Sequence, residues 1–200
     1  GMRPLQLEDD GVELAVFTGH TALCGPAGTG GFYLREGVPL PAAKWGGTGT
    51  GGKVILPDEP ERFEVGTQNL IGLAGLAAGA DFVQQTGLSN IASALQKKVA
   101  FLHDALGVMT GVRVYGKPSG GAAVSFNIAG LSPADVGYIL RHEYDIVVRT
   151  GYHCAPLLAD AIGAPEGTVR VSLSYYTTDA ELTLFLQAVS DLSAGLSRVT

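Results

Sequence analysis

The sequence is poor in cysteine, poor in charge and without a long apolar run. Two cysteines among 200 residues cannot form a disulfide framework, and they do not imply an oxidising compartment. Charged residues make up only 16% of the chain, and the net charge of −6 gives no reason to expect nucleic acid or an anionic membrane as a partner. The most apolar stretch, residues 70–80, is too short to span a bilayer, and the start does not read as a secretory signal. We therefore expect a cytoplasmic protein.

Apolar residues predict strands and helices that alternate along the chain. They make up 46% of it, enough for one core or two small subdomains of an α/β protein. Residues 39–60 are rich in Gly, Pro and Thr and are expected to be irregular. We place a hinge near residue 86, between portions 1–85 and 86–200. The spacing predicts strands over 13–17, 31–35, 112–115, 122–128, 146–149 and 168–174, and helices over 69–85, 89–107, 133–143 and after the capping box Thr178-Asp-Ala-Glu181.

The helix over residues 69–85 is made mainly of small residues, among them Gly72, Gly75 and Gly79. Glycine costs about 1 kcal/mol relative to alanine inside a helix. We therefore expect this helix to pack closely against another stretch of backbone.

The stretch Arg149-Thr-Gly-Tyr-His-Cys-Ala-Pro156 is the strongest chemical signal in the chain. Its glycine and proline place Cys154 in a loop. Arg149 and His153 would favour the thiolate, which is the nucleophilic form of cysteine, if they lie close to it. The alternative is that Cys154 is a small buried apolar residue, which is the more common fate of a free cysteine.

Two arginines each follow a valine on a predicted strand. Arg149 and Arg170 are either surface charges at a strand edge or forks that bind a carboxylate or phosphate. Their spacing leaves both interpretations open.

Two glycine-containing segments could bind phosphate. The segment 25–31 lacks a following Lys-Ser/Thr pair and leads into a strand, so we reject a phosphate loop there in favour of a tight turn. Gly66 and Thr67 precede a helix and could hold a phosphate at its N-terminus; as a plain N-cap, the segment needs no ligand. We expect no metal site, because neither cysteine has ligand spacing with His20, His103, His142 or His153.

Several stretches accompany the cysteine motif: Phe17-Thr-Gly-His20, the segment 25–35, Gly46-Gly-Thr-Gly49, Arg62-Phe-Glu-Val-Gly66-Thr-Gln-Asn69, Val124-Ser-Phe-Asn-Ile128 and Gly167-Thr-Val-Arg-Val-Ser-Leu173. In this order they resemble the class V aminotransferase family, fold type I of the pyridoxal-phosphate enzymes, and most closely its cysteine desulfurases. The likeness covers nearly the whole chain. It implies an α/β fold in which a remnant of the large cofactor domain, residues 1–85, precedes the C-terminal small domain, residues 86–200.

The resemblance also implies roles for individual residues. Cys154 would attack the sulfur of a cofactor-bound cysteine and carry it as a persulfide. Arg170 would grip the substrate carboxylate, and Arg149 and His153 would support that end of the pocket.

Further roles concern pyridoxal phosphate. His20 would neighbour the cofactor phosphate, while Gly66 and Thr67 would reach the phosphate in the partner subunit of a homodimer. One position departs from the family: Thr21 stands where the family has the Schiff-base lysine, and a hydroxyl cannot form an imine. The family's cofactor domain would also begin well before Met2.

These departures lead to three hypotheses. The first is a truncated homologue that does not bind the cofactor covalently and is inactive as an isolated chain. The second is one half of a split or oligomeric enzyme, covered by a missing N-terminal half or a second copy. The third is a cofactor-free sulfur carrier acting through Cys154.

Overall fold

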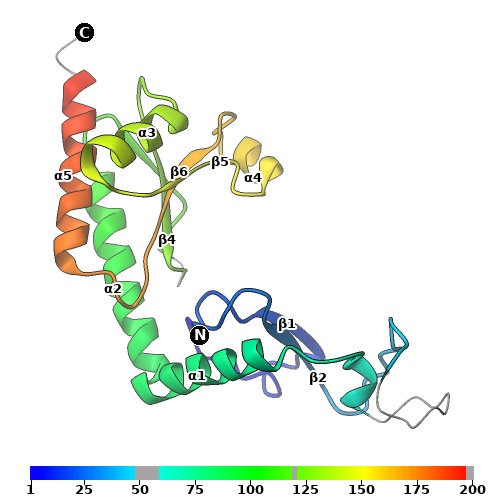
Figure 1. Ribbon diagram of the computed structural model, residues 1–200. Helices are drawn as coiled ribbons and strands as arrows, with labels where there is room; N and C mark the ends of the chain where they lie inside the picture. Colours follow the sequence, from blue (N-terminus) through cyan, green and yellow to red (C-terminus); the bar gives the residue numbers. More distant parts are fainter. Residues whose placement is uncertain (48–58, 119–120, 197–200) are drawn as a thin grey trace. The chain divides into compact units, whose positions relative to one another are not determined.

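The computed structural model describes residues 1–47, 59–118 and 121–196, which form two compact units, one up to Leu88 and one from Ser89 (Figure 1). Each unit is described by itself. The N-terminal unit contains strands β1 (Leu14–Thr18) and β2 (Gly30–Leu34), the 3-10 turn η1 (Glu61–Phe63) and helix α1 (Leu70–Thr86). The C-terminal unit contains α2 (Leu88–Gly107), β3 (Val112–Tyr115), β4 (Ala123–Ile128), α3 (Pro133–Tyr144), β5 (Arg149–Gly151), α4 (Pro156–Ala161), β6 (Thr168–Ser172) and α5 (Asp179–Leu196).

In the N-terminal unit, β1 and β2 form an antiparallel two-stranded sheet. The segment between them is closed by backbone hydrogen bonds from Gly19 N to Thr29 O and from Gly25 N to Gly19 O, each 2.8 Å. Thr29 Oγ1 also donates to Pro26 O at 2.6 Å. The segment then enters β2 directly, so it is a closed turn before a strand and lacks the helix that follows a phosphate loop.

Helix α1 packs against this turn through its glycines. A Cβ at Gly79 would collide with the carbonyl oxygen of Leu23, and a Cβ at Gly75 would come within 2.6 Å of Pro26 Cγ. The expected close packing of this helix against another backbone is therefore confirmed. The glycines' cost in helix propensity is offset by this close packing.

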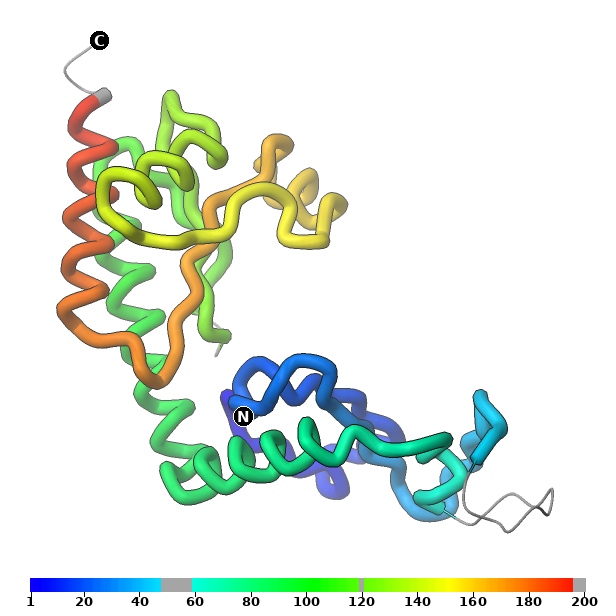
Figure 2. The backbone as a smooth tube through the Cα atoms, in the orientation of Figure 1, coloured from blue at the N-terminus to red at the C-terminus, as the bar shows by residue number. Residues whose placement is uncertain are grey.

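The C-terminal unit is built on an antiparallel sheet with strand order β3-β4-β6-β5. Figures 1 and 2 show α2 and α5 running side by side along it. Phe126 on β4 meets Phe185 on α5 edge to face, with ring centroids 5.8 Å apart. Side chains from the sheet and from three helices fill the core, the largest fully buried ones being Leu102, Leu106, Phe126, Val136, Leu140, Val169 and Val189.

Two helix starts predicted from capping residues are confirmed. The Ser132 hydroxyl accepts from Asp135 N at 3.1 Å at the start of α3. At the start of α5, Thr178 N donates to Glu181 Oε2 at 2.7 Å and Glu181 N donates to Thr178 Oγ1 at 3.2 Å. The hydrogen bonds that the Thr178 backbone N–H and hydroxyl donate to the Glu181 carboxylate lower the pKa of Glu181.

The strand predicted over residues 146–149 is wrong in position. Asp145 ends α3 in a left-handed conformation, with φ 54°, and Ile146 N donates to Leu140 O at 2.9 Å. Ile146 therefore completes the end of α3 and does not begin a strand. Pairing with β6 begins at Arg149, so β5 lies closer to the Cys154 loop than the apolar pattern indicated.

Helix α4 was not predicted. It has six residues, too few for periodicity to reveal. Residues 39–47 contain no helix or strand, as expected. The rest of the predicted irregular segment, and the end of Gly46-Gly-Thr-Gly49, lie largely outside the described residues.

Candidate functional site

The Cys154 loop runs from the end of β5 to the start of α4. Gly151, His153 and Cys154 have left-handed backbone, with φ of 96°, 54° and 64°. For residues with a side chain this conformation costs about 1 kcal/mol, so surrounding contacts must hold the loop. The loop ends at Pro156, which lies in the first turn of α4. Cys154 is an exposed free thiol, so the alternative of a buried apolar cysteine is wrong.

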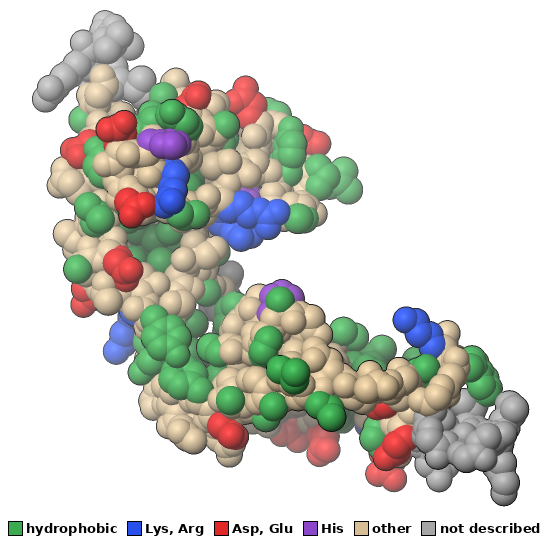
Figure 3. All heavy atoms as spheres, in the orientation of Figure 1, with side chains coloured by type: hydrophobic (Ala, Val, Ile, Leu, Met, Phe, Trp, Pro, Cys, Tyr) green, Lys and Arg blue, Asp and Glu red, His purple; other side chains and the backbone are tan. Residues whose placement is uncertain are grey.

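Arg149 contacts this thiol directly. Its Nη2 donates to Cys154 Sγ at 3.0 Å, which places a positive charge beside the sulfur. Arg149 also lies opposite Arg170 in the β5–β6 pair, which places both side chains on one face of the sheet. Like charges directly opposite each other are destabilising, and a bound anion would remove that cost. Figure 3 shows basic side chains gathered beside a histidine on the C-terminal unit.

The ring of His153 points toward β6. Its Nε2 lies 2.9 Å from the hydroxyl oxygen of Thr168, and its Nδ1 is buried without a hydrogen-bond partner among the described residues. Burial lowers the pKa of His153, and the charges of Arg170 and Arg149 lower it further, against an opposing hydrogen bond that the ring donates to the backbone of Thr168. His153 is therefore neutral at pH 7, and the cation beside Cys154 is Arg149.

Two further residues shape this site and were not singled out from the sequence. Asn127 on β4 donates from Nδ2 to Gly167 O at 3.0 Å and accepts from Val169 N at 3.3 Å. The Asn127 amide thus bonds the residues on either side of Thr168, which is itself 3% exposed. A Cβ at Gly167 would collide with the backbone of Gly151, which explains a glycine there. No local pattern marks either Asn127 or Thr168, because β4 also contains Ser125 and β6 also contains Arg170 and Ser172.

The predicted cofactor-binding residues lie in the N-terminal unit. The His20 Nδ1 atom is 3.0 Å from Thr18 Oγ1, and Thr21 follows it, exposed, in the turn after β1. Gly66 has φ 84°, and Thr67 is exposed just before α1. The structure thus groups the four predicted thiol and substrate residues in one unit and the four predicted cofactor residues in the other.

The start of α1 has a protein cap. Asn69 is the N-cap, and its Oδ1 accepts from Gly72 N at 3.0 Å. This accounts for the helix start without a ligand. The phosphate-binding role of Gly66 and Thr67 stays a prediction.

Among the described residues, no group of three or more His, Cys, Asp or Glu side chains could hold a metal ion. His103 Nε2 lies 3.2 Å from Gly116 O, and His142 stacks on Tyr138 with ring centroids 4.2 Å apart. These two histidines therefore make local structural contacts. Within the same residues, no helix has the length and apolar character needed to cross a membrane.

Comparison with known sequences decides the family. The profile of class-V aminotransferases matches residues 1–185. The chain belongs to the class V aminotransferase family. It is 34% identical over 192 residues to a probable cysteine desulfurase of Methanothermobacter thermautotrophicus, covering 92% of this chain and 48% of that protein. It is 34% identical over 203 residues to a cysteine desulfurase of Klebsiella pneumoniae, covering 98% and 48%. The chain spans between 29% and 48% of the length of the curated relatives it matches.

Solved structures agree with this assignment. The apo cysteine desulfurase of Thermococcus onnurineus NA1 superposes with a TM-score of 0.86 and 34% identity, over 94% of this chain and 49% of that one. A mutant of C-DES with glycine covalently linked to its pyridoxal-phosphate cofactor gives a TM-score of 0.78 and 25% identity, over 95% and 49%. The chain is therefore a cysteine desulfurase-like member of the family, and the predicted α/β fold class is confirmed.

Proposed function

We propose that this chain carries the thiol and the arginines of a cysteine desulfurase site and does not catalyse desulfuration by itself. Cys154 takes up the sulfur, Arg170 and Arg149 hold the carboxylate of cysteine, and His153 lines the same end. The N-terminal unit corresponds to a remnant of the cofactor-binding large domain, and the C-terminal unit corresponds to the small domain.

The observation that carries this proposal is the 3.0 Å contact between Arg149 Nη2 and Cys154 Sγ, made where Arg149 faces Arg170 across two strands. Cysteine presents a carboxylate and a sulfur only a few atoms apart. A guanidinium pair suits the first group, and a thiolate suits the second. In the described part of the chain, neither arginine forms an ion pair with a carboxylate, so both are available to an anion.

The residues at the predicted cofactor positions do not fit covalent attachment of pyridoxal phosphate. Thr21 stands at the position of the family's lysine, and its hydroxyl supplies neither an imine nor an amine base. His20, Gly66 and Thr67 keep groups of the kind that bind phosphate: a ring N–H, backbone N–H and a hydroxyl. When bound, pyridoxal phosphate serves as an electron sink for the substrate. Without the amine, we expect no turnover from this chain alone.

Sulfide release from L-cysteine tests the proposal. The purified chain mixed with pyridoxal phosphate is expected to release no more sulfide than pyridoxal phosphate alone. The Cys154→Ser variant should give the same background. Sulfide release that requires both the cofactor and Cys154 would contradict the proposed inactivity.

A second candidate function, a cofactor-free sulfur carrier, is favoured by the exposure of Cys154 and its contact with Arg149. The Cys154 thiolate would attack the terminal sulfur of a small persulfide, R–S–SH. A new S–S bond forms to Cys154, the S–S bond of the donor breaks, and R–S⁻ leaves.

Mass spectrometry of the chain after treatment with glutathione persulfide tests the carrier. The expected result is a gain of one sulfur atom on Cys154 that survives in Cys24→Ser and disappears in Cys154→Ser. A gain on Cys24 alone, or on neither cysteine, rejects this candidate.

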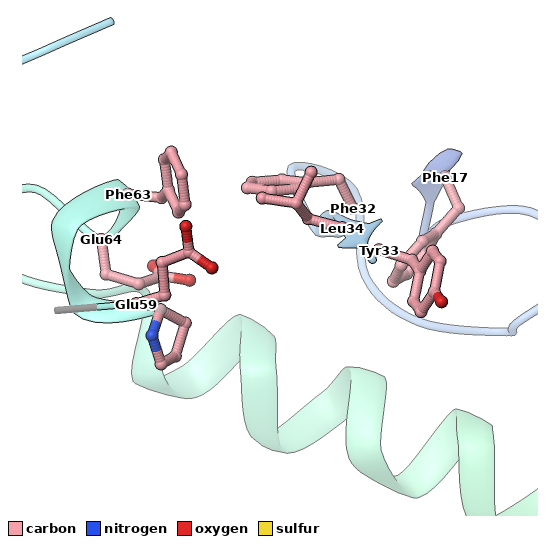
Figure 4. Close-up of a pocket in the computed structure, with 9 residues that line it drawn as sticks. Phe17, Phe32, Tyr33, Leu34, Glu59, Phe63 and Glu64 are labelled. Carbon is pink, nitrogen blue, oxygen red and sulfur yellow. The ribbon is translucent and has the colours of Figure 1, made fainter. Parts of the chain in front are cut away.

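Apolar surface on the N-terminal unit favours association with another chain. Val16 is 79% exposed, Phe17 46% and Phe32 41%. Burying one such side chain fully would contribute about 1.5–3 kcal/mol, so covering these residues with another chain is favourable. A hollow of about 450 Å³ is lined in part by Phe17 and Phe32. Figure 4 shows Phe32, Leu34 and Phe63 around it, with Glu59 and Glu64 nearby.

The occupant we propose for this surface is a second polypeptide, either a copy of this chain or a separately encoded half that supplies the rest of the fold. Light scattering across a concentration series tests the first of these. A dimer supports self-association, and substituting Phe17→Ser with Phe32→Ser should weaken it. A monodisperse monomer at every concentration contradicts it.

A further inference from the structure

Contacts from outside the Cys154 loop hold it in an unfavourable backbone conformation. His153 and Cys154 are consecutive left-handed residues, with φ of 54° and 64°. Such conformations persist where the surroundings over-determine them. Two side chains of the loop reach chain segments beyond it: Tyr152 Oη donates to Pro165 O at 3.1 Å, and His153 Nε2 meets Thr168 Oγ1 at 2.9 Å. The second contact comes from the residue directly before Cys154.

Thr168 is fixed in place from both sides. It is 3% exposed and pairs with Gly151 across β5 and β6. Asn127 bonds the residues before and after it, at Gly167 O and Val169 N. Its hydroxyl therefore offers the loop a rigid attachment point on the buried strand.

We propose that Thr168 is a positioning residue whose hydroxyl holds the His153 ring and thereby keeps the Cys154 thiol against Arg149. This rests on the proposed role of Cys154 and adds a residue to that site. Holding the ring holds the backbone of His153, which sets the direction in which Cys154 leaves the loop. Without the hydroxyl, the loop relaxes toward ordinary backbone angles, and Sγ moves away from the guanidinium that now lies 3.0 Å from it.

The same contact places the proton on the His153 ring. Nδ1 is buried and has no partner within the described part of the chain, and the positive charges of Arg170 and Arg149 act on the ring. A proton on Nδ1 would be an unpaired buried donor near two cations, which is unfavourable. The proton therefore belongs on Nε2, which donates to Thr168 Oγ1.

Alkylation of Cys154 tests this proposal in the full chain without cofactor. Rates with iodoacetamide at pH 7 are measured separately for Cys154 and Cys24 by peptide mass spectrometry. Thr168→Val keeps the shape of the side chain and removes the hydroxyl. We expect this substitution to slow the alkylation of Cys154 by about threefold or more, because the sulfur loses its contact with Arg149, and to leave the alkylation of Cys24 unchanged. Thr168→Ser restores the hydroxyl and should return the rate to within about twofold of wild type.

Nitrogen NMR of the His153 ring reports which ring nitrogen carries the proton. A purely structural role of Thr168 would not change this tautomer. Wild type and Thr168→Ser should show the tautomer protonated on Nε2, and Thr168→Val should show a mixture. The proposal is overturned if Cys154 is alkylated at the same rate in wild type and Thr168→Val. It is also overturned if Thr168→Ser does not restore the wild-type rate. If Thr168→Val does not fold, His153→Asn removes the same contact from the loop side, and an unchanged Cys154 rate there overturns it too.

Failure of this proposal is distinguishable from failure of the proposed function. A wild-type Cys154 that reacts no faster than Cys24 contradicts the role of Cys154 as nucleophile. A still slower Cys154 in Thr168→Val would then support positioning by Thr168 all the same. A fast wild-type Cys154 with an equally fast Thr168→Val keeps the nucleophile and removes Thr168 from the site.

Discussion

Arg149 donates from Nη2 to the sulfur of Cys154 across 3.0 Å, over a loop with left-handed backbone at both His153 and Cys154. The thiol is exposed, so the contact leaves the sulfur accessible to a reagent. Arg149 therefore places a positive charge beside a sulfur that can still be attacked or can itself attack.

Replacing Arg149 with glutamine should slow alkylation of Cys154 at pH 7 by about fivefold, the equivalent of about 1 kcal/mol, because a charged contact to an exposed sulfur is lost. The rate is measured with iodoacetamide and peptide mass spectrometry. Arg141→Gln is the matched control, because Arg141 is an exposed arginine that bonds Asp145 at 2.6 Å. Equal slowing in both variants would assign the effect to net charge and contradict the specific contact.

Arg170→Met should raise the free energy of unfolding by about 0.5 kcal/mol, because it removes a like charge opposite Arg149. The Nε of Arg170 is also buried without a partner among the described residues. Arg113→Met is the control: its guanidinium donates to Ile162 O at 3.1 Å and lies 4.8 Å from the centroid of the Tyr115 ring, so its loss should destabilise. Urea unfolding measures both variants. Equal destabilisation by the two would mean that Arg170 has a structural role.

The caps of the helices could be predicted from local sequence because each cap depends on residues a few positions apart. Ser132, Thr178 and Glu181 each satisfy backbone groups within one turn. The position of β5 could not be predicted in this way. The apolar run after α3 reads as a strand, but its first residues complete the helix end, and only pairing with β6 determines where the strand begins.

Replacing His153 with glutamine should reduce the loss of stability on acidification. In the folded chain, the pKa of His153 lies below the 6.5 of a free histidine. The unfolded chain therefore takes up a proton near pH 6.5, and the folded chain takes it up only at a lower pH. The free energy of unfolding of wild type therefore decreases as the pH falls below about 6.5. Glutamine does not titrate and lacks this contribution.

Urea midpoints of both proteins at pH 7.5 and 5.5 check this sign. The midpoint of wild type should fall more than that of His153→Gln between the two pH values. Identical falls would show that His153 has the same affinity for protons in the folded and unfolded chain. The other three histidines are common to both proteins and cancel in the comparison.

Gly167→Ala should lower the free energy of unfolding by about 2 kcal/mol or more, because a side chain at φ 83° is strained and its Cβ would collide with the backbone of Gly151. Gly107→Ala is the matched control at the end of α2, where a Cβ meets nothing within 4 Å. That variant should be neutral or gain up to about 1 kcal/mol. Similar losses in both would contradict the close approach of β6 to the loop.

Within the site, Cys154 and its two arginines could be identified from motif and residue type. Thr168 and Asn127 could not, because their contacts join strands far apart in the sequence: His153 reaches Thr168, and Asn127 reaches Gly167 and Val169. Threonine is ordinary in a strand, so its type carried no signal. Only the register of β4, β6 and β5 brings these groups together.

Trapping of the cofactor tests the central claim most directly. The chain is incubated with one equivalent of pyridoxal phosphate, reduced with borohydride and digested, and the peptides are analysed by mass spectrometry. With Thr21 at the lysine position, we predict no stoichiometric pyridoxyl group on any residue and no absorption band of a lysine-bound cofactor before reduction. A single lysine that carries close to one pyridoxyl group per chain would contradict the account.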